Sequence, residues 1–560
     1  MTDSNSSVDS KSRKRLAIIG GGSSGLICLK YAQEMLPNWN IRCFEQSDNL
    51  LGCWGNPYPG FVSTSTKFTT QFTCFPIYSA GVSPNASQEK REFFRDGEYG
   101  EYLQAFADQF HLHQNICLQT RVDQMVRSTD LASWRLSLNG RLDGTIQSWY
   151  EDFDQVIICT GLAADPRRIE SQIPQKMPTD LHSGPAIRQR RIVVVGGGES
   201  AVDLADRLSQ PDYENEIFLS LRSGIRVSPR YHPIRGVPSD FLRNRLMLSI
   251  HKDLRNWIGQ RFVRARIKHQ SVFERIFPRR DEQSLEERLT KDAAAKRKYW
   301  DELLTQHAKD ELFNIFHNKS DNFLNAVGEG RIQIVGPPVD QSYDTFREFG
   351  SDAIRSINPD LIVPSIGYRA RLSEISQGTL QLTDFYLGCC HVKYPDLFLV
   401  GFARPVIGNI PTISEMQAEY VCRLISGDLE RPKTLIEANR HPAAWQSHRV
   451  PAFPESDIYP VEMFPYCDQL AELLGRPLKQ NRWKNFPAWC RQQLEPATTL
   501  HYVPSQRLPK AMRRHPIYLP VLLIAALLMI KPIDWIYRSY CRCREQAMTS
   551  GRTGKTEPKG

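Results

Sequence analysis

Residues Leu16-Ala-Ile-Ile-Gly-Gly-Gly-Ser-Ser-Gly25 combine a short apolar run with glycines at the spacing G-x-G-x-x-G. The apolar run predicts a strand, and the residues after the glycines predict a helix. Gly20 allows a tight turn, Gly22 lets backbone N–H groups approach a pyrophosphate at the helix N-terminus, and Gly25 lets the helix pack against the strand. These residues therefore predict the first unit of a dinucleotide-binding domain.

An acidic residue lies at the end of the second predicted strand of this unit. Glu45 follows the next apolar run, 41–44, where a carboxylate can accept hydrogen bonds from ribose hydroxyls. A glycine loop alone is a weak signal, but loop, strand, helix and acidic residue in this order favour a dinucleotide site over a plain structural turn.

A second copy of the motif occurs in the middle of the chain. Gly196-Gly-Gly-Glu-Ser-Ala201 follows the apolar run 192–195 and opens another predicted helix. The strand predicted at 216–221 has no terminal carboxylate, and Arg222 stands where a 2′-phosphate would lie, which favours NADPH over NADH. A surface arginine is the competing interpretation. The first predicted site ends in a glutamate and the second in an arginine. This difference suggests a tightly bound FAD that is reduced by a transiently bound NADPH.

The chain is too long for one hydrophobic core, since cores stop growing at roughly 250–300 residues. It has 560 residues, of which 41% are hydrophobic and 24% charged, and this excludes wholesale disorder. The 71 basic and 62 acidic residues leave a modest surplus that does not require a nucleic-acid partner. The 13 cysteines lack paired metal spacing, so we expect neither a metal site nor a disulfide framework.

The alternation of strand and helix patterns predicts an α/β fold with two Rossmann-like dinucleotide-binding domains, a helical insertion and a C-terminal membrane-associated helix. The expected organisation is a disordered N-terminus at 1–15, an FAD-binding domain at 16–165 and 331–430, an NADPH-binding domain at 186–330 with a helical insertion at 240–325, a C-terminal wrap at 431–510, a membrane anchor at 515–540 and a basic tail at 541–560.

The stretch from Pro516 to Ile530 is the most apolar of the chain. It is shorter than the roughly 20 residues that a spanning helix needs, and basic residues on both sides give no orientation. An interfacial or re-entrant anchor, a tilted span and a buried core helix all remain open. We expect a membrane-associated protein in contact with lipid, with its catalytic domains in the cytoplasm or on an endomembrane such as the endoplasmic reticulum. A homo-oligomer stays open.

The sequence resembles the class B flavin-containing monooxygenases, especially the microsomal-type members, over about residues 15–505. The similar segments are the two glycine loops, Cys43 to Trp54, Ser63-Thr-Ser-Thr-Lys67 with Phe75-Pro76, Cys159-Thr-Gly161, Ser365-Ile-Gly-Tyr368, Gly401 to Gln417 and Asp468 to Gly475.

The resemblance implies a role for each matching position. The residues implied at the FAD are Gly20, Gly21, Gly22, Ser23, Ser24 and Gly25 on the pyrophosphate, Glu45 on the ribose, and Cys53 and Trp54 beside it. Those implied between flavin and nicotinamide are Ser63, Thr64 and Ser65, and those of the NADP loop are Gly196, Gly198, Ser200, Ala201, Val202 and Asp203.

The resemblance also implies an activity like that of the N,N-dimethylaniline monooxygenases. Such an enzyme uses FAD, NADPH and O2, forms a C4a-hydroperoxyflavin, and transfers one oxygen atom to a soft nitrogen or sulfur nucleophile of a small, lipophilic substrate. Thr64 is the expected catalytic residue, as a hydrogen-bond donor beside the flavin and nicotinamide. The alternatives are Baeyer-Villiger oxygenation of a ketone, an NADPH oxidase without oxygen transfer, and a scaffold whose flavin is structural.

Three positions depart from the family pattern. Thr64 stands where the family usually has Asn, and Ile366 stands where it has Thr. The family fingerprint ahead of the second glycine loop is reduced to His182. A threonine offers one hydroxyl and no amide, which motivates the oxidase alternative.

Overall fold

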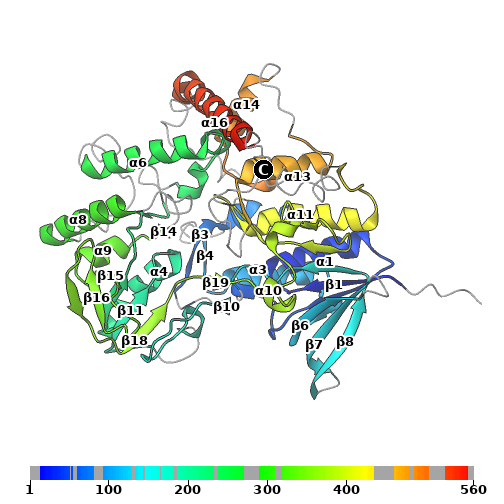
Figure 1. Cartoon of the computed structure of the whole chain (residues 1–560), viewed down its shortest axis with the longest axis horizontal. Coiled ribbons are helices and arrows are strands. Elements are labelled where there is room, and N and C mark those ends of the chain that lie inside the picture. Colours follow the sequence, from blue (N-terminus) through cyan, green and yellow to red (C-terminus); the bar gives the residue numbers. More distant parts are fainter. Residues whose placement is uncertain are drawn as a thin grey trace, which may run out of the picture.

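The structure is a computed structural model of the chain. It describes residues 13–50, 52–54, 58, 60–80, 92–128, 133–142, 145–163, 165–181, 186–231, 237–269, 289–308, 318–405, 407–433, 459–478, 485–503 and 524–552. Two sheets, each with its own helices, form the two halves of the molecule, and helices of the C-terminal part lie along its upper side in the view of Figure 1.

The first sheet has the strand order β20-β21-β22-β9-β1-β2-β5. Its strands are β1 (Arg15–Ile19), β2 (Asn40–Phe44), β5 (Ile116–Cys117), β9 (Gln155–Ile158), β20 (Phe385–Tyr386), β21 (Cys390–His391) and β22 (Leu397–Leu399). The pairs β1–β2, β1–β9 and β9–β22 are parallel, as a doubly wound sheet requires.

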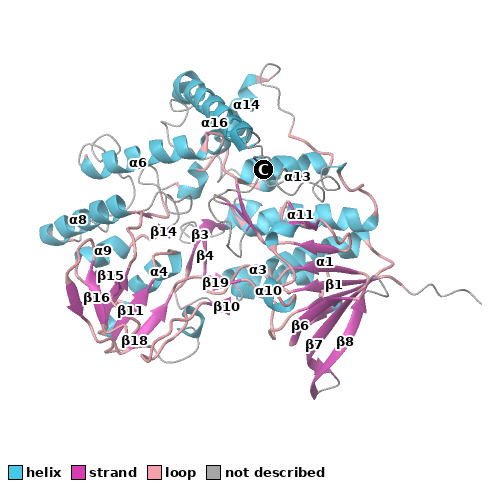
Figure 2. Cartoon of the chain, viewed as in Figure 1, coloured by secondary structure: helices cyan, strands magenta, loops and turns pink. Residues whose placement is uncertain are grey.

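The alternating side chains of β1 enter two separate cores. Leu16 and Ile18 pack in the core that contains helices α1 (Ser23–Met35), α3 (Glu98–Gln109) and α11 (Ile410–Ser426). Ala17 and Ile19 pack in the core beneath an antiparallel meander. The meander consists of β6 (Thr120–Arg127), β7 (Trp134–Leu142) and β8 (Thr145–Phe153). Both faces of the first sheet are therefore covered (Figure 2).

The second sheet has the strand order β17-β16-β15-β12-β11-β18. Its strands are β11 (Arg191–Val195), β12 (Glu216–Ser220), β15 (Ile332–Pro338), β16 (Thr345–Glu348), β17 (Ile354–Ser356) and β18 (Leu361–Pro364). Its helices include α4 (Glu199–Leu208), α8 (Lys291–His307) and α9 (Phe323–Gly328), whose apolar side chains share one core with β11 and β12. The α/β fold with two dinucleotide-binding domains is confirmed.

The second domain is longer than the sequence indicated. The segment 331–364 was expected in the first domain, but its four strands complete the second sheet, with Ile332 of β15 paired to Ile217 of β12. An apolar buried strand looks the same in either sheet, so the pattern could not assign it. The two connections between the domains run side by side as β10 (Asp165–Pro166) and β19 (Tyr368–Arg369).

The remaining elements connect or cover the two domains. The strands are β3 (Val62–Thr66) paired with β4 (Phe93–Arg95), β13 (Val227–Ser228) paired with β14 (Asn318–Lys319), and β23 (Ala403–Pro405) paired with β24 (Tyr459–Val461). The helices are α2 (Lys67–Thr70), α5 (Arg245–Leu248), α6 (Lys252–Lys268), α10 (Leu372–Ile375), α13 (Met463–Leu473), α14 (Phe486–Leu494) and α16 (Lys531–Arg552).

The C-terminal helix α16 contacts the protein through charged groups. Asp534 is buried, accepts a 2.7 Å hydrogen bond from the backbone N–H of His251, and pairs with Arg538. Lys531 donates to Ser249. None of the helices in the described ranges is both long and apolar enough to cross a membrane. Of the alternatives for the predicted anchor at 515–540, a spanning helix therefore has no support in those ranges, and residues 515–523 lie outside them.

Candidate cofactor and reaction site

The first glycine loop has the close contacts that its sequence predicted. Gly20 has φ +106°, and a Cβ there would lie 2.6 Å from the carbonyl oxygen of Cys159. A Cβ on Gly25 would lie 1.8 Å from the Gly20 carbonyl oxygen, so only glycine lets α1 pack against β1. The N-cap of α1 is Gly22, which has no side chain to bind the N–H groups of the first turn. Phosphate oxygens are suitable acceptors for them.

The second glycine loop repeats this geometry. Gly196 has φ +133°, and a Cβ there would lie 2.3 Å from the carbonyl oxygen of Ser365. Gly198 is the N-cap of α4, and no atom of the described residues lies within 4 Å of a Cβ built on it. The helix N-terminus is therefore open to a ligand.

An unsatisfied hydroxyl lies beside each loop. Thr160 follows β9 next to Gly20, and Ser365 follows β18 next to Gly196. The Thr160 Oγ1 and Ser365 Oγ atoms are buried, and neither has a hydrogen-bond partner among the described residues. Because buried hydroxyls rarely go unpaired, these two equivalent orphans fit bound dinucleotides that supply the missing partners.

Glu45 lies where a ribose is expected. Its side chain is buried at the end of β2, and its two carboxylate oxygens accept hydrogen bonds from the backbone N–H groups of Gly21 at 2.7 Å and Ser47 at 2.8 Å. These bonds fix the carboxylate beside the first glycine loop. Each oxygen keeps a lone pair for a ribose hydroxyl.

The segment Gly52–Trp54 forms a short 3-10 helix against the first loop. A Cβ on Gly22 would lie 3.5 Å from the Cα of Gly52. Cys53 is exposed, and Trp54 packs edge-on against Phe61 and Tyr99. Cys53 and Trp54 thus lie next to the predicted FAD site.

The three predicted site residues of strand β3 have different surroundings. The Ser63 hydroxyl donates to the carbonyl oxygen of Ser65 and accepts from the backbone N–H of Phe94, so it stabilises the β3–β4 pair. Thr64 lines a cavity of about 100 Å³ between β3 and the start of α4. Ser65 is half-buried. Of the three, Thr64 is the residue that lines the cavity shared with the second domain.

The start of α4 forms the opposite wall of this cavity. Ser200 and Asp203 line it, together with Glu199. The side chains of Ala201 and Val202 are buried in the second core, so only their backbone is available to a cofactor. In the first loop, the hydroxyl of Ser24 lies 3.0 Å from that of Ser414, within hydrogen-bond distance. Ser23, the residue before it, is half-buried.

Arg230 of the second domain links β3 to α4 through hydrogen bonds and an ion pair. Arg230 donates to the carbonyl oxygens of Val62 and Ser63, and its guanidinium lies 3.6 Å from Asp203. Asp203 also accepts a 2.8 Å hydrogen bond from the hydroxyl of Tyr58. Burial raises the pKa of Asp203, although Arg230 and Tyr58 oppose the shift.

Lys319 of β14 is a buried cation in the same cavity. Its ammonium group donates to the carbonyl oxygen of Thr64. Burial, followed by the charge of Arg243, lowers the pKa of Lys319 to about 7. Burial raises the pKa of Glu199, while Lys319 and Arg404 act in the opposite direction. A lysine whose pKa is about 7 and a carboxyl group whose pKa is raised therefore line the same cavity as Thr64.

The other predicted positions have separate surroundings. Arg222 is exposed just beyond the end of β12, consistent with either interpretation of it. Ile366 is 40% exposed beside the second loop. His182 lies outside the described residues. Sequence reasoning missed Tyr58, and also missed Arg230, Lys319, Thr160 and Ser365; only the last two had a signal, since each follows a strand in a family-like segment.

Two Rossmann-like domains, each with a glycine loop at a helix N-terminus, are the arrangement of a protein that binds two dinucleotides. A family model described as flavin-binding monooxygenase-like matches residues 13–294, which is half of the chain. The protein belongs to this family. It is a flavin-dependent monooxygenase whose cofactors are FAD and NADPH.

Known relatives are similar over most of their length. The chain is 22% identical over 487 residues to a 4-hydroxybenzoate brominase (decarboxylating) of Marinomonas mediterranea, covering 83% of this chain and 84% of the relative. It is 24% identical over 461 residues to flavin-containing monooxygenase 1 of Homo sapiens, with 76% of each covered. It is 24% identical over 502 residues to dimethylaniline monooxygenase (N-oxide-forming) 2 of Rattus norvegicus, covering 82% and 83%.

Solved structures share the fold. S-allyl-L-cysteine S-oxygenase from Allium sativum superposes with a TM-score of 0.53 at 14% identity, covering 93% of this chain and 99% of that one. Cyclohexanone monooxygenase from Rhodococcus sp. Phi1 bound to NADP+ superposes with a TM-score of 0.51 at 15% identity, covering 83% and 98%.

Proposed function

We propose that the protein uses NADPH and O2 to transfer one oxygen atom to a soft nitrogen or sulfur nucleophile of a small organic molecule. The observation that carries this proposal is the shared cavity of Thr64 and Ser200, which belong to the two different domains. A flavin on the first loop and a nicotinamide on the second would meet there. The N-oxide-forming relative supports nitrogen as one acceptor atom.

The residues of the chain would bind and orient the two cofactors. The N-terminus of α1 and Glu45 would hold FAD, and the N-terminus of α4 with Ser365 would hold NADPH. Reduced FAD supplies activation of O2, and the protein supplies position and a site closed to water.

Thr64 has one donor to offer in that site. Its carbonyl oxygen accepts a hydrogen bond from Lys319, which fixes the backbone, and Thr64 lines the cavity. The hydroxyl would donate a hydrogen bond to a cofactor group, and Lys319, with its pKa of about 7, would exchange protons nearby.

The test is a product analysis under ¹⁸O2 with NADPH and three compounds, namely N,N-dimethylaniline, thioanisole and cyclohexanone. We expect one labelled oxygen in the N-oxide or the sulfoxide. Labelled lactone alone would replace the proposal by Baeyer-Villiger oxygenation. Stoichiometric peroxide without any labelled product would replace it by the oxidase function, which the single hydroxyl of Thr64 favours.

We also propose that the C-terminal region contacts membrane lipid at an endomembrane, with the catalytic domains on the cytoplasmic side. Exposed apolar side chains near the start of α16 support this: Ile524, Leu528, Met529, Ile533 and Ile536. Flotation of the full chain with anionic vesicles tests the proposal. We expect the double variant Leu528→Glu/Met529→Glu to stay in the dense fraction, whereas equal flotation of both proteins would refute it.

A further inference from the structure

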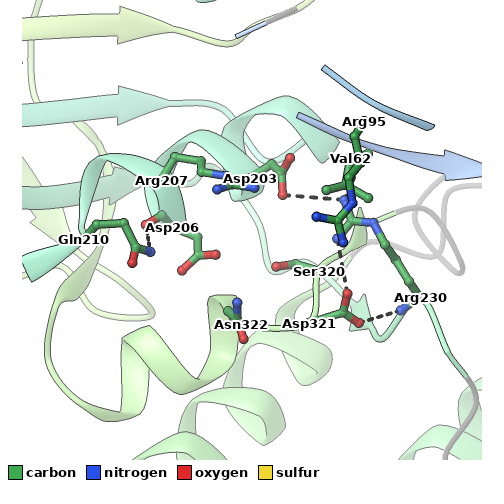
Figure 3. A pocket seen from close by; sticks show the side chains of 10 residues that line it. All are labelled: Val62, Arg95, Asp203, Asp206, Arg207, Gln210, Arg230, Ser320, Asp321 and Asn322. Atoms are coloured by element: carbon green, nitrogen blue, oxygen red, sulfur yellow. Dashed lines mark hydrogen bonds and ion pairs between the residues drawn. The ribbon is translucent and has the colours of Figure 1, made fainter. Parts of the chain in front are cut away.

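Arginines of the second domain bind the backbone that leads into strand β3. Arg207 of α4 donates to the carbonyl oxygen of Gly60. Arg230 donates to the carbonyl oxygens of Val62 at 2.7 Å and Ser63 at 3.1 Å. Figure 3 shows both arginines with Val62 in the wall of a cavity of about 270 Å³. Each of these bonds joins a charged donor to a neutral carbonyl oxygen of the first domain.

Lys319 extends this row of cations to the next residue of β3. Its ammonium group donates to the carbonyl oxygen of Thr64. Lys319 belongs to β14, and the partner strand β13 lies just before Arg230 in the chain. The pairing of these two short strands therefore brings Arg230 and Lys319 to neighbouring positions along β3.

The same part of the first-domain chain also packs in the second domain. The side chain of Tyr58 is buried in the core of the second sheet, and Phe61 packs against that core. Strand β3 pairs with β4 at Val62 and Thr66, and the register shifts between these two positions. The chain around Thr64 thus belongs to the first domain in sequence but is bound by side chains of the second.

Strand β14 also contacts the second glycine loop. The side-chain amide of Asn318, the residue before Lys319, donates a 2.9 Å hydrogen bond to the carbonyl oxygen of Gly197. Successive side chains of a strand point to opposite sides. One residue of β14 therefore binds the glycine loop and the next binds Thr64, so that the two residues link the predicted NADPH site to the reaction cavity.

Of the three cations, Lys319 is the one that loses its charge near neutral pH. Burial, followed by the charge of Arg243, lowers the pKa of Lys319 to about 7. Arg230 adds to this decrease, whereas Asp240 and Glu199 oppose it. An arginine keeps its charge throughout this range. Because a charged donor forms the stronger hydrogen bond, the bond from Lys319 to β3 weakens as the pH rises above 7.

We propose that Lys319 is a positioning residue: its ammonium group holds the Thr64 backbone beside the second glycine loop, and the loss of its proton loosens this hold. The proposal rests on the proposed oxygenation and goes beyond proton exchange by Lys319. Thr64 is then fixed beside the cofactors in mildly acid solution. In alkaline solution it is held less firmly, and more H2O2 is formed per NADPH oxidised.

The test is hydrogen–deuterium exchange of the oxidised holoenzyme without NADPH, measured by mass spectrometry on the peptide that contains β3. After correction for the intrinsic effect of pH, we expect exchange in the wild type to be about 10-fold faster at pH 8.5 than at pH 6. Lys319→Met should exchange fast at both pH values. Lys296→Met, at an exposed lysine of α8, is the matched control and should behave as the wild type does.

The variant Lys319→Arg keeps the test valid if Lys319→Met folds poorly. A guanidinium stays charged at both pH values, and the adjoining cavity of about 100 Å³ leaves room for it. We expect slow exchange of β3 at pH 6 and at pH 8.5. With thioanisole as substrate, the ratio of H2O2 formed to NADPH oxidised should rise with pH in the wild type and stay constant in this variant.

Equal exchange of the wild type and Lys319→Met at pH 6, or the same pH dependence in the wild type and Lys319→Arg, would overturn this proposal. A change in exchange without a matching change in the H2O2 ratio would also overturn it, since Lys319 would then stabilise β3 without positioning Thr64. The exchange measurement needs no turnover. Formation of H2O2 alone at every pH would refute the oxygenation, and the exchange of β3 would still decide whether Lys319 holds Thr64.

Discussion

The hydroxyl of Tyr58 donates a 2.8 Å hydrogen bond to Asp203, and this bond joins the segment before β3 to the first turns of α4. Tyr58 is 8% exposed and packs in the core of the NADPH domain. A residue of the FAD-domain chain therefore anchors the helix that opens at the NADPH loop.

The variant Tyr58→Phe removes this bond and leaves Asp203 paired with Arg230 alone. We expect a loss of about 1–2 kcal/mol in the free energy of unfolding, because a buried carboxylate loses one donor. Reduction of the bound FAD by NADPH should also slow, since the bond orients α4. Denaturant unfolding and stopped-flow bleaching of the flavin measure both effects. Tyr150→Phe, at an exposed tyrosine on β8, is the control, and equal behaviour of both variants would contradict the prediction.

The two glycines of the NADPH loop should respond differently to alanine. Gly196→Ala forces a side chain into φ +133° and against the Ser365 carbonyl oxygen, so we expect a loss of roughly 2 kcal/mol or more in stability. Gly198→Ala meets open space and should leave stability nearly unchanged, but its methyl group would block close approach of the pyrophosphate and weaken NADP+ binding. Thermal unfolding and NADP+ titration separate the two effects, and tight NADP+ binding by Gly198→Ala would show that the cofactor lies elsewhere.

Substitution of Thr64 should change the amount of H2O2 formed per NADPH oxidised. Thr64→Val keeps the shape of the side chain but removes the hydroxyl, so we expect a larger ratio of H2O2 formed to NADPH oxidised. Thr64→Asn introduces an amide with two donors, and we expect a smaller ratio. Both variants should bleach FAD at the wild-type rate. An unchanged ratio in both would remove Thr64 from the reaction site.

Two buried histidines should make the protein sensitive to acid. Burial lowers the pKa of His391 and of His501 from 6.5 to about 4. Between these pH values the unfolded chain binds protons that the folded chain does not, so stability falls as the pH decreases from 6.5 to 4. Each histidine contributes up to roughly 3 kcal/mol to this loss. We expect His501→Gln to flatten the dependence of the unfolding free energy on pH across this window, and an equally steep slope would contradict the assignment.

Sequence reasoning succeeded where function depends on a local pattern. The two glycine loops and Glu45 have the geometry that their spacing predicted, because backbone turns and strand ends are encoded by neighbouring residues. It failed for Lys319 and Arg230, which reach the cavity from segments with no motif of their own. Only tertiary structure brings such residues to Thr64.

Two further predictions depended on context that the pattern does not contain. The strands at 332–364 are as apolar as those of the first sheet, and pairing with β12 alone decides their domain. The apolar C-terminal stretch left an interfacial anchor, a tilted span and a core helix open, and Asp534 within the predicted anchor is buried against the backbone of His251. A charge that a lipid phase would exclude is here bound by protein.

The order of strands in the first sheet has a consequence for biosynthesis. β22 (Leu397–Leu399) pairs with β9 (Gln155–Ile158). The sheet of the FAD domain therefore cannot be completed until the ribosome has synthesised the chain through β22. The chain of the NADPH domain, whose sheet ends with β18 at Pro364, is complete earlier, so this domain can fold before the FAD domain during synthesis. The flavin would therefore find the complete sheet of its domain only late in translation or after release of the chain.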